Sequence, residues 1–462
     1  MNSVLHFVLG SRADWHLHRP ALPRLRPGLH LVGPLAIVAA CVVGWPAFAG
    51  AVGEDGSVAF GLWVGSLSIV LMAWSFVLAL RPKVLEPLFG GLDSMYRVHR
   101  WAGALAVVAM FLHTSVEPEI EDGIRGVSKS VAEGAVDLAG VGEIMLYILV
   151  GLSLARVVPY RYWRWTHKLL GVPFVFASWH FFTAEKPYTN GSGWGWWFGL
   201  WMLAGICAYL VRVVGVDVFR RGRRYRVVQT EHGTSVTRLE LEPIGRPLRR
   251  RLGQFAFLKL DVDGMSEPHP FTIASAPENN NLVFFIRRLG DWSQNLPGRE
   301  LGGREARIEG PFGRFRPLGR TDTPTVWIAG GVGITPFLAA LEGIQHHKPS
   351  PVLLYAARPE EEDLVLDRLR HAEAARKVEL HLFTGADARM TPEVLDLMFP
   401  DGMEGIHVAL CGPTGLVRSM SAAARRLGAD TIETEDFDIR QGFGPERSVE
   451  IARVVANRGL ST

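Results

Sequence analysis

Four histidines in the N-terminal half of the chain have a type and spacing that would suit iron. Over residues 31–231 the histidines are His99, His113, His167 and His180, and each lies in or beside an apolar stretch. An imidazole surrounded by hydrocarbon must find partners for its nitrogens or cost several kcal/mol. Two neutral imidazoles can occupy the two axial positions of one haem iron. The four histidines therefore predict two six-coordinate haem sites.

The spacing of the histidines predicts how they pair across helices. His99 and His113 are fourteen residues apart, and His167 and His180 are thirteen apart. Parallel helices would therefore place His99 with His167, the first pair, and His113 with His180, the second pair. Fourteen residues return to within about 40° of one helix face, whereas thirteen miss by roughly 140°. A kink at Pro173, between His167 and His180, would correct that phase.

Other interpretations of these residues stay open. Each histidine alone fits a hydrogen-bonded packing residue. Zinc fits less well, because the pairs lie about 20 Å apart along the helix and no cysteine or aspartate accompanies them there. The basic residues near the first pair suit either haem propionates or positively charged cytoplasmic loops. These residues are Arg97, Arg100, Arg164 and Lys168.

The histidines need membrane helices to position them. Six apolar segments are long enough, or nearly so, to cross a hydrocarbon layer of roughly 30 Å. They lie near residues 29–50, 60–80, 97–116, 139–157, 166–184 and 194–216. Arginine and lysine gather in the loops at one end, and the acidic sequence EPEIEDG lies at the other. The sequence predicts a protein of a bacterial-type inner membrane with both termini cytoplasmic. The alternative is a buried bundle in a soluble protein.

Composition agrees with a partly membrane-embedded chain. Hydrophobic residues make up 48% of the 462 residues, with 14 Trp and 24 Phe. The net charge of +3 gives no reason to expect a nucleic-acid partner. Three scattered cysteines, Cys41, Cys207 and Cys411, supply neither a disulfide framework nor a four-cysteine iron–sulfur cluster.

The pattern changes after the sixth apolar segment. Short β-rich runs such as YRVVQT and FAFLKLDV, separated by Gly and Pro, predict an antiparallel β-barrel over 219–320. Strands that alternate with helices, beginning at TVWIAGG, predict a parallel α/β domain over 321–462. We therefore expect a multidomain chain, in which these two domains follow a cytoplasmic segment (1–28) and a six-helix transmembrane haem domain (29–218).

Motifs in the second half carry a family resemblance. HPFTIASAP, IRRLGDWSQNL, EGPFG, AGGVGITP and LCGP occur in this order. In combination with the histidine pairs, they make the chain resemble the NADPH oxidase and ferric reductase family of bacterial flavocytochrome b type. The dehydrogenase half of that family is similar to ferredoxin-NADP reductase. The resemblance covers about residues 60 to 440, and it implies FAD, two b-type haems and NADPH or NADH as cofactors.

The barrel is the expected flavin-binding domain. The resemblance implies that the flavin ring lies against the residues of the HPFT segment, and the following serine offers a hydroxyl. The segment IRRLGDWS suits the binding of a pyrophosphate. It contains an arginine, and backbone amides follow a glycine whose backbone can adopt many conformations. The candidate flavin residues are His269, Pro270, Phe271, Thr272, Ser275, Arg287, Gly290 and Ser293. Taken singly, each also fits an ordinary barrel strand or turn.

A glycine turn between a strand and a helix predicts the NAD(P)H site. In VWIAGGVGITPFLAAL, Gly330, Gly331 and Gly333 let a pyrophosphate approach the helix that Thr335 and Pro336 open. Taken alone, a short glycine-rich sequence of this kind more often forms a tight turn than a nucleotide-binding site. Its place after a flavin barrel favours the site.

Residues at the ends of later strands complete the predicted site. Cys411, Gly412 and Pro413 end a strand at the sheet edge where the nicotinamide is expected. Cys411 is thus a catalytic candidate, with a buried structural cysteine as the alternative. Phe437 resembles the late aromatic residue that stacks on the flavin in this family. Arg358 ends the second strand, and a guanidinium there would favour NADPH by binding its 2′-phosphate.

Together these features predict a transmembrane oxidoreductase. Electrons would pass from cytosolic NAD(P)H through FAD and two haems to a small acceptor at the outer face, because haem iron accepts one electron at a time. The acceptor would be a ferric chelate or O₂, which gives superoxide, and the acidic loop favours ferric ion. Two alternatives stay open: a membrane haem subunit that relays electrons to a protein partner, and a reductase whose membrane anchor holds no haem.

Overall fold

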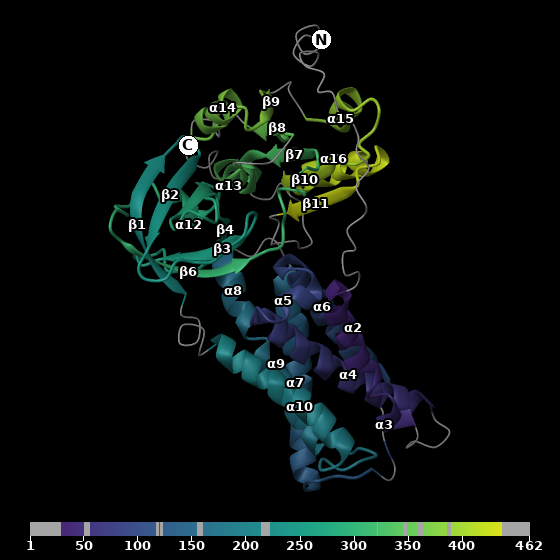
Figure 1. Ribbon diagram of the computed structural model, residues 1–462. Helices are drawn as coiled ribbons and strands as arrows, with labels where there is room; N and C mark the ends of the chain where they lie inside the picture. Colours follow the sequence, from purple (N-terminus) through teal and green to yellow (C-terminus); the bar gives the residue numbers. More distant parts are fainter. Residues whose placement is uncertain are drawn as a thin grey trace, which may run out of the picture. The chain divides into compact units, whose positions relative to one another are not determined.

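The computed structural model describes residues 29–49, 56–116, 120, 123–154, 160–213, 222–320, 322–344, 349–357, 364–385 and 390–436. It contains two compact units (Figure 1). One is helical and lies within residues 26–219, and the other is mixed and lies within residues 220–438.

The helical unit carries the apolar segments. Its described helices are α2 (Leu29–Val42), α3 (Pro46–Ala49), α4 (Gly56–Ala79), α5 (Glu86–Phe89), α6 (Leu92–Val116), α7 (Lys129–Leu154), α8 (Tyr160–Lys168), α9 (Gly171–Thr183) and α10 (Gly193–Val213). Helical segments therefore lie at all six predicted positions. Four of the described segments are long and apolar enough to cross a membrane: Leu29–Ala49, Gly56–Ala79, Lys129–Leu154 and Gly193–Val213.

The two histidine-bearing segments do not meet that standard of length and composition. In α6 the two histidines and two arginines lower the mean hydropathy, and α9 has only 13 residues. Polar side chains in such positions are unfavourable in hydrocarbon and are kept where they serve a function. The shortfall of α6 therefore results in part from its histidines and arginines, whereas that of α9 results from its length.

The fifth predicted segment, 166–184, is not one continuous helix. α8 ends at Lys168, and Leu169 and Leu170 donate to carbonyls three residues back before α9 begins. Pro173 explains the break, because it has no N–H to donate and its ring blocks the preceding turn. The break changes the rotation between the two histidines of this segment, as their thirteen-residue spacing requires.

Small residues let the helices approach closely. On α4, Ser68 Oγ donates to the carbonyl of the fully buried Ala106 on α6 at 2.8 Å. Phe174 on α9 is also fully buried, and its ring centre lies 5.2 Å from that of Phe76. A Cβ at Gly205 on α10 would lie 2.6 Å from the Phe174 ring, so glycine makes room for it.

Six antiparallel strands form the predicted barrel. They are β1 (Arg223–His232), β2 (Val236–Pro243), β3 (Phe255–Leu260), β4 (His269–Thr272), β5 (Leu282–Arg287) and β6 (Glu305–Phe312). Their order is β4-β3-β6-β1-β2-β5, and the edge strands β4 and β5 approach each other, so the barrel is nearly closed. A short helix, α12 (Asp291–Gln294), follows β5. Alternate strand residues such as Leu239, Leu241, Leu258 and Leu260 fill the interior.

Five parallel strands form the predicted α/β sheet. They are β7 (Thr325–Gly330), β8 (Val352–Ala357), β9 (Glu379–Thr384), β10 (His407–Gly412) and β11 (Thr431–Asp436), in the order β11-β10-β7-β8-β9. The helices are η1 (Gly331–Ile334), α13 (Thr335–Gly343), α14 (Leu366–Ala374), α15 (Pro392–Met398) and α16 (Thr414–Arg426). The strand order changes direction between β7 and β10, and ligands of such sheets bind outside the carboxyl ends of the strands at that point.

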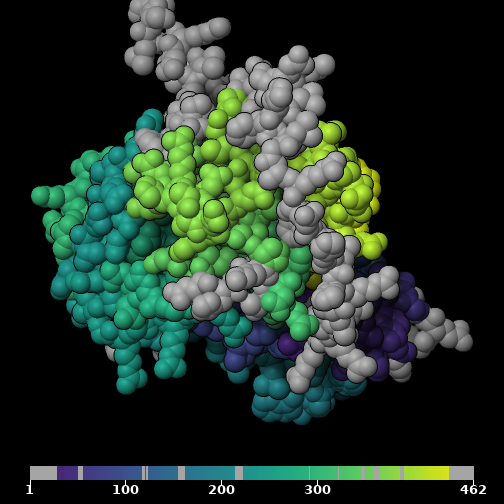
Figure 2. All heavy atoms as spheres, turned by 45° about the horizontal axis from the view of Figure 1, so that its top comes forward, coloured from purple at the N-terminus to yellow at the C-terminus, as the bar shows by residue number. Residues whose placement is uncertain are grey.

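One apolar cluster contains residues of both the barrel and the sheet. Along β7, Trp327 packs on the face that α13 and α14 cover, and Ile328 packs on the face that α15 and α16 cover. The first of these clusters also contains Val283 and Phe285 of the barrel. Figure 2 accordingly shows the teal barrel and the green sheet region in direct contact.

Candidate functional site

The first histidine pair comes together between α6 and α8. The ring centres of His99 and His167 lie 6.1 Å apart. Two imidazoles that bind one metal from opposite sides have ring centres about 6 Å apart, because each nitrogen lies about 2 Å from the metal. The spacing of this pair therefore fits a haem iron with two axial histidines.

Both rings of this pair are oriented through Nδ1. His99 Nδ1 lies 2.9 Å from the carbonyl oxygen of Ser75 and 2.9 Å from its hydroxyl. His167 Nδ1 lies 2.9 Å from Ser153 Oγ, and its ring stacks on Trp163. Because a carbonyl only accepts, His99 Nδ1 carries the hydrogen. Its Nε2 therefore keeps the lone pair that a metal needs.

In the second predicted pair, His113 is oriented through Nδ1 in the same way. His113 Nδ1 donates to the carbonyl of Gly61 at 2.8 Å, so its Nε2 is also left as an acceptor. A Cβ on Gly65 would lie 2.7 Å from His113 Nδ1, so only glycine leaves room for the ring. Within the part of the chain that the structure describes, His180 Nδ1 is buried without a hydrogen-bond partner. Buried nitrogens without a hydrogen-bond partner are rare in proteins. This one therefore indicates that the His180 ring has a role other than packing.

A carboxylate near the second pair was missed by sequence reasoning. Glu143 on α7 accepts hydrogen bonds from Thr114 Oγ1 at 2.9 Å and from the Tyr147 hydroxyl at 2.6 Å. Thr114 adjoins His113. The signal was available, because an acidic residue inside an apolar span is a functional candidate by default.

The basic residues near the first pair have protein partners. Arg97 forms an exposed ion pair with Asp93 at 3.1 Å, and Lys168 Nζ lies 4.7 Å from the centre of the Trp165 ring. Contact of these residues with haem propionates stays a prediction. Among the described residues, no three His, Cys, Asp or Glu side chains form a metal-binding group.

Strand β4 carries the predicted flavin-ring residues. Pro270 fits there because β4 is an edge strand. The ring of Trp292 lies 4.7 Å from that of His269 and 5.6 Å from that of Phe271, centre to centre. Thr272 Oγ1 is buried and makes no hydrogen bond to any of the residues that the structure describes. A buried hydroxyl without a partner is rare, and it fits a strand that offers a hydrogen bond to a polar ring such as flavin.

The other predicted flavin residues follow this strand in the barrel sequence. Ser275 Oγ accepts a hydrogen bond from Arg250 at 3.0 Å. Ser293 Oγ accepts one from the amide of Gly290 at 3.1 Å, so that amide is used within the barrel. Arg287 ends β5. Binding of a pyrophosphate by these groups stays a prediction.

The glycine turn after β7 packs backbone to backbone against the end of β10. Gly331 has a φ of +53°, which favours glycine. A Cβ on Gly333 would lie 2.3 Å from the carbonyl oxygen of Cys411, and one on Gly412 would lie 3.0 Å from the amide of Gly330. The two turns thus meet at the switch point of the sheet, where a dinucleotide is expected.

The remaining nucleotide candidates differ in position. Thr335 begins α13 and donates to the carbonyl of Val332 at 3.0 Å. Pro336 lies in the first turn of α13, where its missing N–H is tolerated, and Pro413 precedes α16. The Cys411 side chain is fully buried in the apolar core, so its catalytic role stays a prediction. Arg358 and Phe437 lie outside the described residues.

Three protein-family models match successive parts of the chain. Residues 64–178 match a ferric reductase like transmembrane component. Residues 224–330 match an FAD-binding domain, and residues 327–422 match an oxidoreductase NAD-binding domain. These matches agree with the helical unit, the barrel and the parallel sheet in order.

Individual proteins also match. Ferric reduction oxidase 7, chloroplastic, of Arabidopsis thaliana is 24% identical over 329 residues, which are 62% of this chain and 40% of that protein. NADPH oxidase 1 of Rattus norvegicus is 32% identical over 151 residues, which are 31% of this chain and 26% of that protein. The chain thus spans less than two thirds of either relative. A solved FAD/NAD-binding domain of nitric oxide dioxygenase from Vibrio cholerae is 24% identical, with a TM-score of 0.43, and covers 47% of this chain and 99% of that one.

Proposed function

Since the chain belongs to the ferric reductase and NADPH oxidase family, we propose that it transfers electrons from NAD(P)H through FAD and two b-type haems to an acceptor across a membrane. The observation that carries the proposal is the 6.1 Å separation of the His99 and His167 rings, which fits two histidines that would together hold one haem iron. Flavin and nucleotide domains in the same chain supply the donor side.

Each part of the chain has its own task in this proposal. When bound, FAD accepts a hydride from NAD(P)H and releases single electrons, which haem iron can carry. Ser75, Ser153 and Gly61 hold three of the imidazoles with Nε2 directed away from their own hydrogen bonds. Thr272 offers its unpaired hydroxyl to the flavin, and the glycine turn admits the pyrophosphate.

The orientation and the need for two haems follow from the membrane. The positively charged loops support both termini and both cofactor domains in the cytoplasm of a bacterial-type cell. A hydrocarbon layer of roughly 30 Å is too thick for one haem to bridge, so two histidine pairs at two depths are required. The lipid bilayer and a small outer acceptor are therefore the proposed partners, and no nucleic acid is involved.

The acceptor can be tested directly. We expect NADPH-fuelled protein in liposomes to reduce a ferric chelate about tenfold faster than it makes superoxide, because the acidic sequence EPEIEDG attracts cationic iron. The rates are measured as ferrous-chelate absorbance and as dismutase-sensitive reduction of cytochrome c. Strong suppression of cytochrome c reduction by dismutase would contradict this expectation, because it would show that electrons pass mainly to O₂.

Two other outcomes of that experiment are informative. Reduced flavin and haem without turnover of either small acceptor would favour a haem subunit that serves a protein partner. A preparation without a Soret band would contradict the proposal and support an anchor without haem.

The nucleotide preference rests on Arg358. We expect Arg358→Ala to lower kcat/KM for NADPH roughly ten- to a hundredfold and to leave kcat/KM for NADH unchanged, because a charge-assisted bond to a 2′-phosphate is worth about 1.5 to 3 kcal/mol. Arg370→Ala, at an exposed position of α14, is the matched control. Equal losses with both nucleotides would assign Arg358 to structure, and so would no loss with either.

A further inference from the structure

A loop of the barrel is held by a buried arginine. The loop covers residues 275–281 and follows β4, the strand with the predicted flavin-ring residues. Arg250 donates hydrogen bonds along it. The acceptors are Ser275 Oγ at 3.0 Å and the carbonyl oxygens of Ala276, Asn279 and Asn281 at 2.6, 2.7 and 3.1 Å. One guanidinium therefore fixes most of the loop.

The position of Arg250 is electrostatically unusual. The residue is only 9% exposed, and all the loop acceptors are neutral oxygens. A buried cation is unfavourable unless hydrogen bonds and opposite charge offset its loss of water. Burial lowers the pKa of Arg250, and nearby acidic groups that include Glu342 and Glu278 act in the opposite direction. The charge of Arg250 is thus balanced in part by Glu278 of the loop and in part by Glu342, which lies outside the loop.

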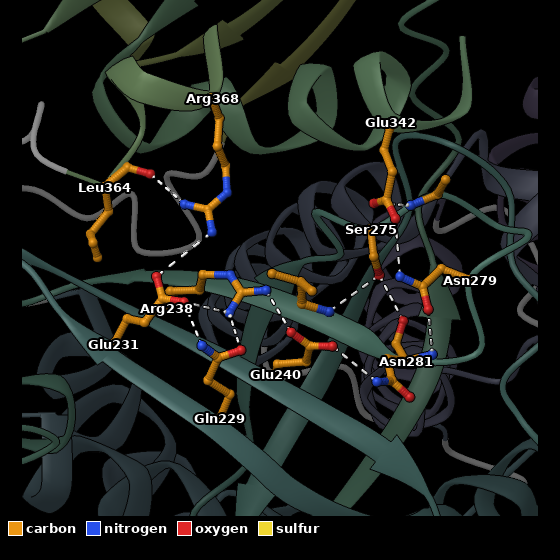
Figure 3. Close-up of polar contacts among 12 residues, drawn as sticks. Gln229, Glu231, Arg238, Glu240, Ser275, Asn279, Asn281, Glu342, Leu364 and Arg368 are labelled. Carbon is orange, nitrogen blue, oxygen red and sulfur yellow. Dashed lines mark hydrogen bonds and ion pairs between the residues drawn. The ribbon is translucent and has the colours of Figure 1, made fainter. Parts of the chain in front are cut away.

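Glu342 of α13 holds the same loop from the other side. Its carboxylate accepts hydrogen bonds from the amide of Ala276 at 2.9 Å and from Asn279 Nδ2 at 3.0 Å (Figure 3). Ala276 therefore gives its carbonyl to Arg250 and its amide to Glu342. Asn279 is shared in the same way, through its carbonyl and its side chain. The loop is clamped between two opposite charges.

The clamp joins the two cofactor-binding segments. α13 has nine residues, begins directly after the glycine turn of the nucleotide site and carries Glu342 near its other end. A helix of this length is a stiff rod of about 14 Å. Through it, the glycine turn is connected to the loop that continues from the flavin strand.

We propose that Arg250 and Glu342 are positioning residues that set the distance between nicotinamide and flavin. The proposal deepens the proposed function and rests on it. The step concerned is transfer of a hydride from NAD(P)H to FAD, which with one proton from water gives NAD(P)⁺ and FADH₂. Such a transfer depends steeply on geometry, since a displacement of about 1 Å can lower a rate about a hundredfold.

The clamp is not needed to hold the barrel and the sheet together. Val283 and Phe285 of the barrel already share an apolar cluster with Phe337 and Leu338 of α13. The loop also has room to move, because a cavity of about 520 Å³ lies beside it. Its lining includes Asn279, Glu342, Arg238, Glu240 and Arg368. Loss of the clamp is therefore expected to change geometry more than stability.

The test uses full-length protein with FAD and an excess of NADPH under anaerobic conditions. In Glu342→Gln one of the two loop donors faces an amide NH₂ instead of an oxygen, so we expect the rate constant of flavin reduction to fall about tenfold. The charge-transfer absorbance between nicotinamide and flavin should weaken in parallel. FAD content and the Kd for NADPH should stay as in the wild type, and the melting temperature should fall only slightly, because Glu342 is exposed and its charge is screened by water.

Two further variants and a control sharpen the test. Arg250→Lys keeps the charge, but the shorter lysine side chain ends before the position of Nη2, the atom that makes all four loop contacts, so it should show the same loss. The double variant should lose little more than either single variant, because both break one clamp. Glu373→Gln, at an exposed site on α14, should behave as wild type.

The outcomes separate the clamp from the function on which it rests. Flavin reduction at the wild-type rate in Glu342→Gln overturns the clamp, and so does a loss that lies wholly in FAD content or nucleotide affinity. Additive losses in the double variant overturn it as well. If NADPH fails to reduce the flavin of the wild type itself, the proposed function is wrong and the clamp fails with it.

Discussion

His113→Ala and His180→Ala are each expected to remove one of two b-type haems and to leave flavin reduction by NAD(P)H intact. His113 Nδ1 is already bonded to Gly61, so Nε2 is its only nitrogen left for iron. Loss of one axial imidazole leaves that haem held from one side only. The haem-to-protein ratio, measured as pyridine haemochrome, should fall from about two to about one, with the rate of flavin reduction within about twofold of wild type.

His30→Ala is the matched control for the histidine variants. His30 is an exposed histidine on α2, in the same unit as the two pairs but outside both. It should retain both haems. Retention of both haems in His113→Ala or in His180→Ala would contradict the ligand assignment. The Soret spectrum of each variant also shows whether the remaining haem keeps its six-coordinate form.

The sequence predicted that His99 pairs with His167 but not what orients these rings. Spacing alone put His99 at the depth of His167, and their 6.1 Å separation agrees with that pairing. The orienting groups Ser75 and Ser153 lie on α4 and α7, and which helix faces which is set by tertiary packing. Polar side chains inside the apolar spans were the available signal for such functional groups. They include the hydroxyls of Ser75 and Ser153 and the carboxylate of Glu143.

The barrel and the sheet were predictable because their patterns are local. Alternation of apolar and polar residues marks strands, and a glycine turn before a helix marks a nucleotide fold. The clamp was not predictable in the same way. Glu342 and Ala276 are 66 residues apart in the chain, and only the packing of α13 against the barrel brings them together. Arg250 looks in the sequence like one of three adjacent surface arginines.

The side chain of Cys411 illustrates a further limit of sequence reasoning. Its place at the carboxyl end of β10 follows from the motif, as does its closeness to the glycine turn. Which way the side chain points depends on the alternation along β10, and here it lies in the core beneath α13 and α14. The structure therefore draws attention to the backbone of Cys411, which packs against Gly333.

Gly333→Ala is accordingly expected to lower the rate of flavin reduction by NAD(P)H about a hundredfold, a loss of about 3 kcal/mol. The added Cβ would lie 2.3 Å from the carbonyl oxygen of Cys411 and 2.6 Å from its carbon, so backbone must move. Any such movement separates the two turns that meet at the switch point, where the dinucleotide is proposed to bind. Rapid mixing with NADPH measures the loss.

Gly415→Ala is the matched control for this variant, because it adds the same methyl group in the first turn of α16, where no described atom outside the local backbone lies within 4 Å. Its rate of flavin reduction should equal that of the wild type. Both variants should keep their FAD and haem content, and dithionite should still reduce both groups, because the change is confined to the nucleotide site. Flavin reduction at the wild-type rate in Gly333→Ala would contradict a dinucleotide site at this turn, since the methyl group can be accommodated only by opening it.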